Sequence, residues 1–209
     1  MLGNLKNGCR TIGGLFLLAA IAAGCGGGES SGPETEPTGE ELVAQGWEAF
    51  ESSDWTRALA RFQAALSADV LPADAYNGLG WTYATVDSFR LALGFFDAAL
   101  GAGVAGADPY AGKSVVLREN APPDYAGAVT AASEALDRSP RYQFAHDPTF
   151  DWRDLHLLLA QCNFALTLYG EAGAHVDSLG GTPPDPSSPD YVEELSEEIE
   201  DLASGIAGS

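Results

Sequence analysis

Residues 74 to 99 of this 209-residue chain read DAYNGLGWTYATVDSFRLALGFFDAA, and this stretch decides the fold. In its first half, four residues follow helical spacing: Tyr76, Leu79, Gly80 and Tyr83. In its second half, Ala92, Phe96 and Ala99 stand at offsets of 0, 4 and 7. Because such offsets place side chains on one face of an α-helix, the stretch predicts two helices joined by a short turn.

The second half of this pattern recurs along the chain. An aromatic residue followed three positions later by alanine occurs four times: Trp55 and Ala58, Phe89 and Ala92, Tyr125 and Ala128, Tyr169 and Ala172. Successive alanines are 34, 36 and 44 residues apart. The first half recurs too, because Gly46-Trp47 and Gly80-Trp81 are 34 residues apart. A period of this length indicates a helical repeat protein.

These helix pairs resemble the tetratricopeptide repeat (TPR), whose pattern has Leu-Gly and Tyr in its first helix (helix A) and Ala and Phe in its second (helix B). The matching residues are Leu79-Gly80, Tyr83, Ala92, Phe96 and Ala99, with Pro140 at the end of the third copy. The resemblance covers residues 40–181. It implies an all-α fold, a helix-turn-helix solenoid of about four repeats plus a C-terminal capping helix. The third copy has two extra residues at 119–124, and the fourth has a ten-residue insertion around 142–148.

Several helix starts can be predicted from capping residues. Thr38 and Glu41 have the spacing of a capping box. Asp108-Pro109 and Asp147-Pro148 predict an N-cap followed by proline at the first helical position, and Ser188-Pro189 predicts the start of the last helix.

Residues 182–209 are predicted to form a Pro-rich spacer and an acidic amphipathic helix. The apolar face of that helix carries Tyr191, Val192, Leu195, Ile199 and Leu202. A solenoid needs a terminal element with one polar side, so this helix is interpreted as a cap. A helix that docks onto a partner is the alternative interpretation.

The N-terminus predicts export and a lipid anchor. Residues 1–24 have the basic start, short apolar run and small residues of a signal peptide, and 22–25 read Ala-Ala-Gly-Cys, which resembles a bacterial lipobox. Cys25 is then the lipidated residue, and residues 25–39 form a flexible tether. An ordinary secretory signal with an incidental Cys25 is the alternative.

Composition and motifs argue against nucleic acid binding and catalysis. The 30 acidic residues against 10 basic ones give a net charge of −20, which repels phosphate backbones. We find no motif for a nucleophile, a metal or a cofactor, and Cys162 lies in an apolar helical run as a buried thiol. One polar cluster could bind a metal or share a proton: His146, Asp147, Asp151, Asp154 and His156. Capping and packing roles are the favoured interpretation of this cluster, so the chain is predicted not to be an enzyme.

One stripe of helix A is the predicted partner-binding groove, since the corresponding stripe of a TPR faces the concave side. It carries seven residues: Glu40, Trp47, Glu51, Asp74, Asn77, Trp81 and Asp108. The alternative for the two tryptophans is packing between helices as core. If they do line a groove, its acids and indoles suit a protein or peptide segment with Lys or Arg between apolar anchors.

The sequence therefore predicts a membrane-anchored TPR lipoprotein. We expect a non-enzymatic protein-protein interaction scaffold in the bacterial cell envelope, with its lipid anchor in the outer membrane and its repeats facing the periplasm. An accessory binding protein for a small molecule or extracellular ligand is the alternative.

Overall fold

The computed structural model describes residues 36–68 and 72–208, which form helices joined by turns and loops, with no β-strand in these ranges. The helices are α1 (Gly39–Glu51), α2 (Trp55–Ser67), α3 (Pro72–Thr85), α4 (Phe89–Gly101), α5 (Asp108–Glu119), α6 (Tyr125–Arg138), α7 (Trp152–Ala165), α8 (Tyr169–Ser178) and α9 (Tyr191–Ala207). The predicted signal peptide, Cys25 and most of the tether lie outside the described residues. No helix in the described ranges has the length and apolarity needed to cross a membrane.

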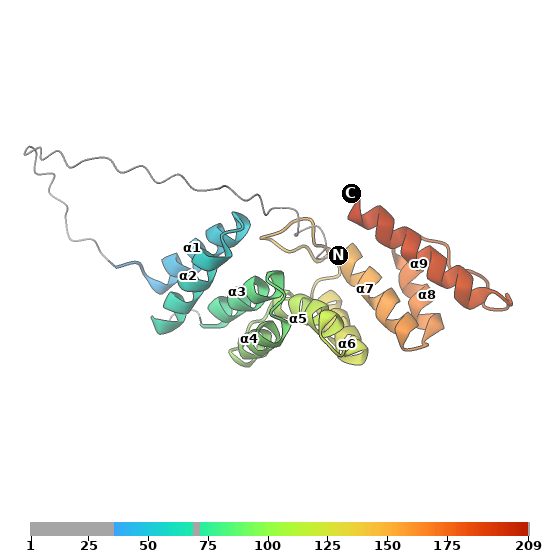
Figure 1. The fold of residues 1–209 in the computed structure, drawn as a ribbon, viewed down its shortest axis with the longest axis horizontal. Coiled ribbons are helices and arrows are strands. Elements are labelled where there is room, and N and C mark those ends of the chain that lie inside the picture. Colours follow the sequence, from blue (N-terminus) through green and yellow to red (C-terminus); the bar gives the residue numbers. More distant parts are fainter. Residues whose placement is uncertain (1–35, 69–71, 209) are drawn as a thin grey trace, which may run out of the picture. The chain divides into compact units, whose positions relative to one another are not determined.

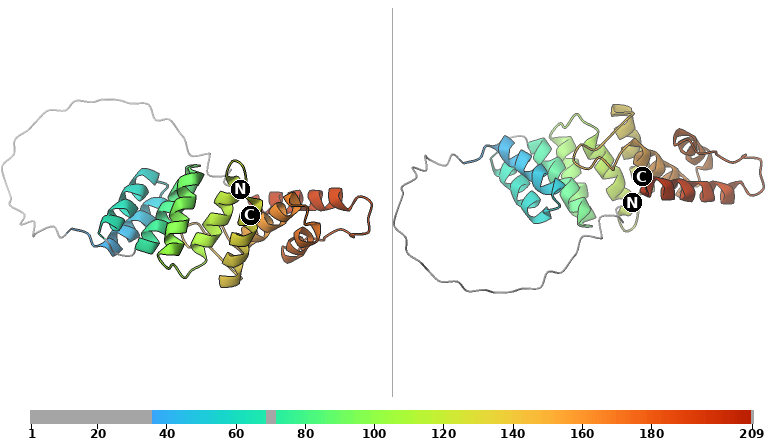
Figure 2. Two further views of the ribbon diagram at one scale, coloured as in Figure 1. Left: turned by 90° about the horizontal axis from the view of Figure 1, so that it is seen from below. Right: turned by 90° about the horizontal axis from the view of Figure 1, so that it is seen from above.

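The helices pack as consecutive pairs (Figure 1, Figure 2). Each helix contacts the next one in the chain, and α1, α3, α5, α7 and α9 also contact one another in that order. The odd-numbered helices therefore form one layer, corresponding to helix A of each repeat, and α2, α4, α6 and α8 form the other. This all-α helical-repeat solenoid confirms the predicted fold class.

Glycine and phenylalanine hold neighbouring repeats together. The buried ring of Phe96 on α4 lies against both Gly80 on α3 and Gly112 on α5. A Cβ added at Gly80 would stand 2.6 Å from Phe96 Cε1, which no real side chain tolerates. Phe62 on α2 lies in the same way between Gly46 and Gly78. Glycine in helix A thus makes room for the helix-B phenylalanine, which explains the recurrence of both residues.

The turn inside a repeat is the same in three repeats. Ser53, Asp87 and Thr167 adopt left-handed backbone angles, with φ of 59°, 57° and 62°. In each turn the next residue donates its N–H back to the first helix, for example Asp54 N to the Ala49 carbonyl at 2.8 Å. This is a Schellman ending, which satisfies carbonyls that a helix end leaves free. The third repeat has its predicted extra residues here, between α5 and α6.

One of the four predicted helix starts has the predicted cap, and the other three do not. Thr38 and Glu41 form the expected capping box on α1. Asp108 is the first residue of α5, whose N-cap is Ala107, so Asp108 does not cap that helix. Asp147 does not cap a helix either, because its carboxylate accepts hydrogen bonds from Thr149 in a loop. The helix that follows starts at Trp152.

The actual cap of α7 is Asp151. Its side chain accepts a hydrogen bond from Arg153 N at 2.8 Å, while Asp154 accepts one from Asp151 N at 2.8 Å. This reciprocal pair is a capping box made by two aspartates. The last helix likewise begins at Tyr191, two residues after the predicted Ser188-Pro189 start.

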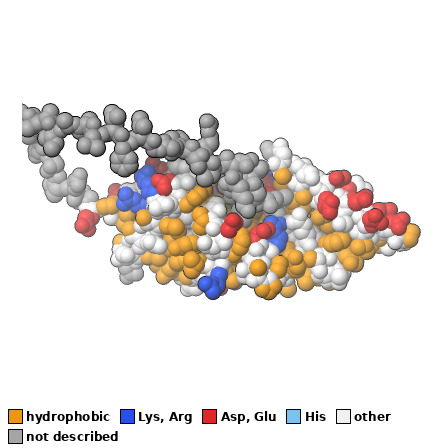
Figure 3. Space-filling model, in the orientation of Figure 1, with side chains coloured by type: hydrophobic (Ala, Val, Ile, Leu, Met, Phe, Trp, Pro, Cys, Tyr) orange, Lys and Arg blue, Asp and Glu red, His pale blue; other side chains and the backbone are white. Residues whose placement is uncertain are grey.

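Helix α9 packs on α7 and α8, where the next helix A would lie. Leu195 and Ile199 are buried there, and the Tyr191 hydroxyl donates to the Tyr169 carbonyl at 3.1 Å. Val192, predicted on the same face, is instead 41% exposed because it lies beside the contact. Acidic side chains gather over the far side of α9 (Figure 3): Glu193, Glu194, Glu197, Glu200 and Asp201. This helix therefore occupies the position of the predicted cap.

Candidate partner-binding face

The seven residues predicted to bind a partner lie on α1, α3 and α5, and we call their side of these helices the helix-A face. Their exposure differs widely. Glu40, Asp74 and Glu51 are exposed, whereas Asn77 is 6% and Trp81 7% exposed. Trp47 and Asp108 are half-buried. The two tryptophans and Asp108 are near a segment that the sequence did not place here.

A segment from much later in the chain covers this face. Residues 139–151, which we call the α6–α7 loop, leave α6 and run past α5 and α3 to α1 before returning to α7 (Figure 1). The loop turns back on itself, because Phe144 N donates to the Phe150 carbonyl at 3.0 Å and Trp152 N to the Tyr142 carbonyl at 2.8 Å. Gln143 and Asp151 form an isolated antiparallel bridge.

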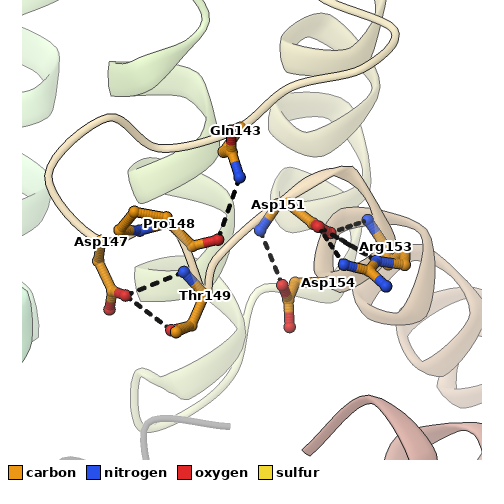
Figure 4. A network of polar contacts seen from close by, with 7 residues as sticks. All are labelled: Gln143, Asp147, Pro148, Thr149, Asp151, Arg153 and Asp154. Atoms are coloured by element: carbon orange, nitrogen blue, oxygen red, sulfur yellow. Dashed lines mark hydrogen bonds and ion pairs between the residues drawn. The ribbon is translucent and has the colours of Figure 1, made fainter. Parts of the chain in front are cut away.

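The loop has its own set of polar contacts (Figure 4). Gln143 Nε2 donates to the Pro148 carbonyl at 3.3 Å, and the Asp147 carboxylate accepts from the Thr149 hydroxyl at 2.6 Å. The Asp151 carboxylate pairs with the Arg153 guanidinium at 2.6 Å. These bonds lie within the loop or at the start of α7, so the loop is folded by local contacts.

Phe144 is the centre of the contact between the loop and the helix-A face. Its ring is 1% exposed and stacks on Trp81, with centroids 4.1 Å apart and planes at 20°. It also meets Trp47 and Phe50 edge to face, at 6.0 and 5.9 Å. Aromatic pairs in these arrangements add to the free energy gained from burial. Phe144 therefore anchors the loop.

His146 lies at the α1 end of the face. Its ring stacks flat on Trp47, with centroids 3.8 Å apart and planes at 3°, and its Nδ1 lies 2.8 Å from Glu51 Oε1. A carboxylate accepts the proton of whichever imidazole form carries hydrogen on Nδ1, and the pair gains charge assistance when the ring is protonated. His146 thus contacts an aromatic face and an acid at once.

Tyr142 lies at the α5 end and is 2% exposed. Its hydroxyl lies close enough to the Asp108 carboxyl group for each group to shift the pKa of the other. Burial raises the pKa of Asp108, while Tyr142 and the charge of His146 act in the opposite direction. Burial and the nearby Asp108 charge raise the pKa of Tyr142, so the phenol stays protonated.

The two tryptophans belong both to the core and to the helix-A face. Trp47 contacts Phe62 at 5.0 Å and Trp81 contacts Phe96 at 5.7 Å, each edge to face with the phenylalanine of its own repeat. Their other sides meet the loop. Groove and core were therefore not exclusive alternatives, because each indole contacts both its own repeat and the loop.

The polar cluster considered for metal or proton chemistry is not assembled. His146 points to α1, whereas His156 on α7 lies with its Nδ1 3.1 Å from Nδ1 of His175 on α8. The three aspartates make the caps and turns described above. Within the described residues, no group of three or more His, Cys, Asp or Glu could hold a metal ion.

Cys162 is fully buried in α7, as the sequence predicted. Burial raises the pKa of its thiol to about 11, which leaves almost no thiolate at neutral pH. The thiol therefore packs as a small apolar group.

The alternating helices, the glycine–phenylalanine contacts and the repeated turns define a TPR-type solenoid. No family model and no curated protein matches the chain. Among solved structures it is similar to one titled "MamA RS-1 ArsTM double mutant", with 19% identity over 76% of this chain and 75% of that chain, and a TM-score of 0.53. It is also similar to YrrB, a TPR protein with an unusual peptide-binding site, with 18% identity over 78% of this chain and 86% of that chain, and a TM-score of 0.59. These similarities show that the chain has the TPR fold.

Proposed function

We propose that this chain is a lipid-anchored TPR scaffold of the bacterial cell envelope that captures a segment of a partner protein on its helix-A face. One observation carries the proposal: the face of α1, α3 and α5 receives an extended polypeptide, the α6–α7 loop of the chain itself. A face that accepts this segment has the shape and side chains to accept another. The peptide-binding site named for the structural neighbour YrrB is consistent with this use of the fold.

The charges of the face favour a basic partner. Glu40, Glu51 and Asp74 are exposed on α1 and α3, the helices that carry the two indoles, and Glu51 already faces an imidazole. Exposed ion pairs contribute little free energy, so aromatic contacts supply most of the affinity and the acids supply selectivity and salt dependence. The partner segment is accordingly one with Lys or Arg between apolar anchors.

The anchor at Cys25 sets where this capture takes place. A diacylglyceryl group and a further acyl chain on one cysteine give stable membrane attachment, and the proposed tether, residues 25–39, joins this anchor to the repeats. We propose the outer membrane, with the repeats in the periplasm.

Site-specific photo-crosslinking in cells tests the proposal. A crosslinking residue placed at Glu40 or Asp74 reports on the helix-A face, and one placed at Gln63 on exposed α2 serves as the control. We expect a single protein to be crosslinked from Glu40 and Asp74 and not from Gln63. Equal crosslinking from all three positions, or a small ligand that copurifies without any protein, would contradict the proposal.

A further inference from the structure

We infer that the α6–α7 loop occupies the site to which the partner segment binds. The partner segment has an aromatic–x–aromatic–x–cation sequence and displaces the loop from this site. The inference rests on the proposed function and deepens it, because it names the chemistry of the partner and the step that precedes capture.

The loop presents alternate residues to the helix-A face. Tyr142 and Phe144 are buried and His146 is half-buried, whereas Gln143 and Ala145 between them are exposed. This two-residue period is that of an extended strand, whose side chains point to opposite sides in turn. Three successive inward side chains therefore contact the face: a phenol at α5, a phenyl ring at α3 and an imidazole at α1.

The α1 position suits a permanent cation better than it suits histidine. The indole face of Trp47 and the carboxylate of Glu51 both attract positive charge, and His146 contacts both. Imidazole carries that charge only when protonated, whereas Lys and Arg carry it throughout the physiological range. A partner with Lys or Arg here gains interactions that the loop makes only in part.

The covered face also leaves hydrogen bonds unmade. Among the described residues, three buried side-chain polar atoms have no hydrogen-bond partner: Asn77 Oδ1, Trp81 Nε1 and the Tyr142 hydroxyl. All three belong to the stripe of α3 or to the loop that covers it. Buried polar groups are normally paired, and leaving them unpaired is unfavourable. A partner segment that makes a hydrogen bond to Asn77 or Trp81 therefore gains binding free energy that the loop does not have.

The loop can leave without unwinding its neighbours. Its turn is closed by its own bonds, such as Phe144 N to the Phe150 carbonyl. The capping box of Asp151 and Asp154 starts α7 independently of the helix-A face. Displacement thus exchanges one extended segment for another over an intact repeat array.

Peptide binding to the full chain tests the inference. The probe is a fluorescein-labelled peptide with the loop sequence SPRYQFAHDPTFD in which Lys replaces the His. A matched control peptide has Ala at the Tyr, Phe and Lys positions. Three proteins are compared. They are the wild type, a release variant that combines Phe144→Ala with His146→Ala, and a control variant, Ala145→Ser, which changes an outward-facing residue of the loop.

We expect the release variant to bind the Lys peptide at least 10-fold more tightly than the wild type or Ala145→Ser. In the latter two, the tethered loop competes at an effective concentration of about 1 mM. The control peptide should not bind. Adding Glu51→Gln to the release variant should weaken its binding of the Lys peptide, because the cation then lacks its carboxylate partner.

Two outcomes would overturn the inference. Equal affinity of the wild type and the release variant would show that the loop does not occupy the peptide site. A release variant that keeps its helical circular dichroism but binds no peptide would show that the face serves only the chain's own loop.

A release variant that fails to fold is replaced by NMR of the wild type. An excess of the Lys peptide should shift the indole N–H signals of Trp47 and Trp81, and the Ala peptide should not; absence of these shifts overturns the inference. Crosslinking from Glu40 in cells tests the proposed function separately. If a partner is crosslinked there but no peptide displaces the loop, the scaffold function stands and the inference about the loop is rejected.

Discussion

Trp47 and His146 stack with their ring centroids 3.8 Å apart and their planes at 3°. One ring belongs to α1, at the start of the repeats, and the other to the loop before α7. The pair joins the first repeat to the fourth across the helix-A face, and Glu51 closes it with a contact of 2.8 Å to a residue 95 positions away. This relationship determines how the face can be used.

The indoles are expected to matter for stability, and to different degrees. Trp81 is 7% exposed between Phe96 and Phe144, so Trp81→Ala should lower the free energy of unfolding by about 3–5 kcal/mol. Trp47→Ala should have a smaller effect because its ring is half-buried. Urea unfolding followed by circular dichroism measures both. A Trp81→Ala variant as stable as the wild type would contradict the packing described.

Two glycine-to-alanine substitutions should change the stability of the protein in opposite directions. A Cβ at Gly112 would overlap the buried ring of Phe96, so Gly112→Ala should destabilise the protein by about 1–3 kcal/mol. At Gly94, in the middle of α4, a Cβ would meet nothing within 4 Å. Gly94→Ala should therefore stabilise by about 0.5–1 kcal/mol, because alanine has the higher helix propensity. Thermal melts test this: Gly94→Ala should melt above the wild type and Gly112→Ala below it. The opposite order would contradict the glycine–phenylalanine packing between repeats.

Stability should fall as the pH drops below about 6.5, partly because of two histidines. Burial, together with a smaller effect of the charge of neighbouring His156, lowers the pKa of His175 to about 4. Burial, followed by the charge of Arg141, also lowers the pKa of His156. The unfolded chain binds protons near pH 6.5 and the folded chain does not, so unfolding is favoured between about pH 6.5 and 4.

The double variant His156→Gln, His175→Gln isolates this effect, because glutamine does not titrate. The free energy of unfolding, measured in urea at pH 7 and pH 5, should change less in the double variant than in the wild type. The carboxylates titrate in both proteins and cancel in the comparison. Identical pH dependence of the two proteins would remove the histidine pair as a cause.

Replacing Cys25 by Ser should release the protein from the membrane or leave its signal uncleaved, since the thiol that receives the lipid is gone. Membrane fractionation and labelling with a radioactive fatty acid measure the change. Cys9→Ser, in the predicted signal peptide, is the control and should retain both anchoring and label. Unchanged labelling of Cys25→Ser would reject the lipoprotein hypothesis.

The repeat architecture could be predicted from the sequence because its determinants are local and periodic. Ala92, Phe96 and Ala99 have a spacing that places all three on one face of a helix, and this spacing recurs along the chain. Glycine recurs in helix A where the phenylalanine of helix B packs against it. The same periodicity placed the apolar face of α9 on the repeats. Helix starts were predicted less well, since a proline after aspartate fits a loop such as Asp147–Thr149 as well as a helix start.

The covering of the helix-A face could not be predicted in this way. The insertion around 142–148 was recognised as extra length, and its alternation of Tyr142, Phe144 and His146 was the available signal. A two-residue period over so short a stretch does not say what the residues contact. The position of the loop depends on its contacts with Trp47 and Trp81, which are far from it in the sequence. The exposure of these two tryptophans depends in turn on the loop.

The sequence by itself determined the helices, their pairing and the stripe of aromatic and acidic residues, because each follows from spacing along one chain segment. Only the tertiary structure decided that the stripe is occupied and that His146 stacks on Trp47 rather than joining His156. Those contacts join residues with no fixed spacing, and their free energy depends on the shape that the packed repeats present.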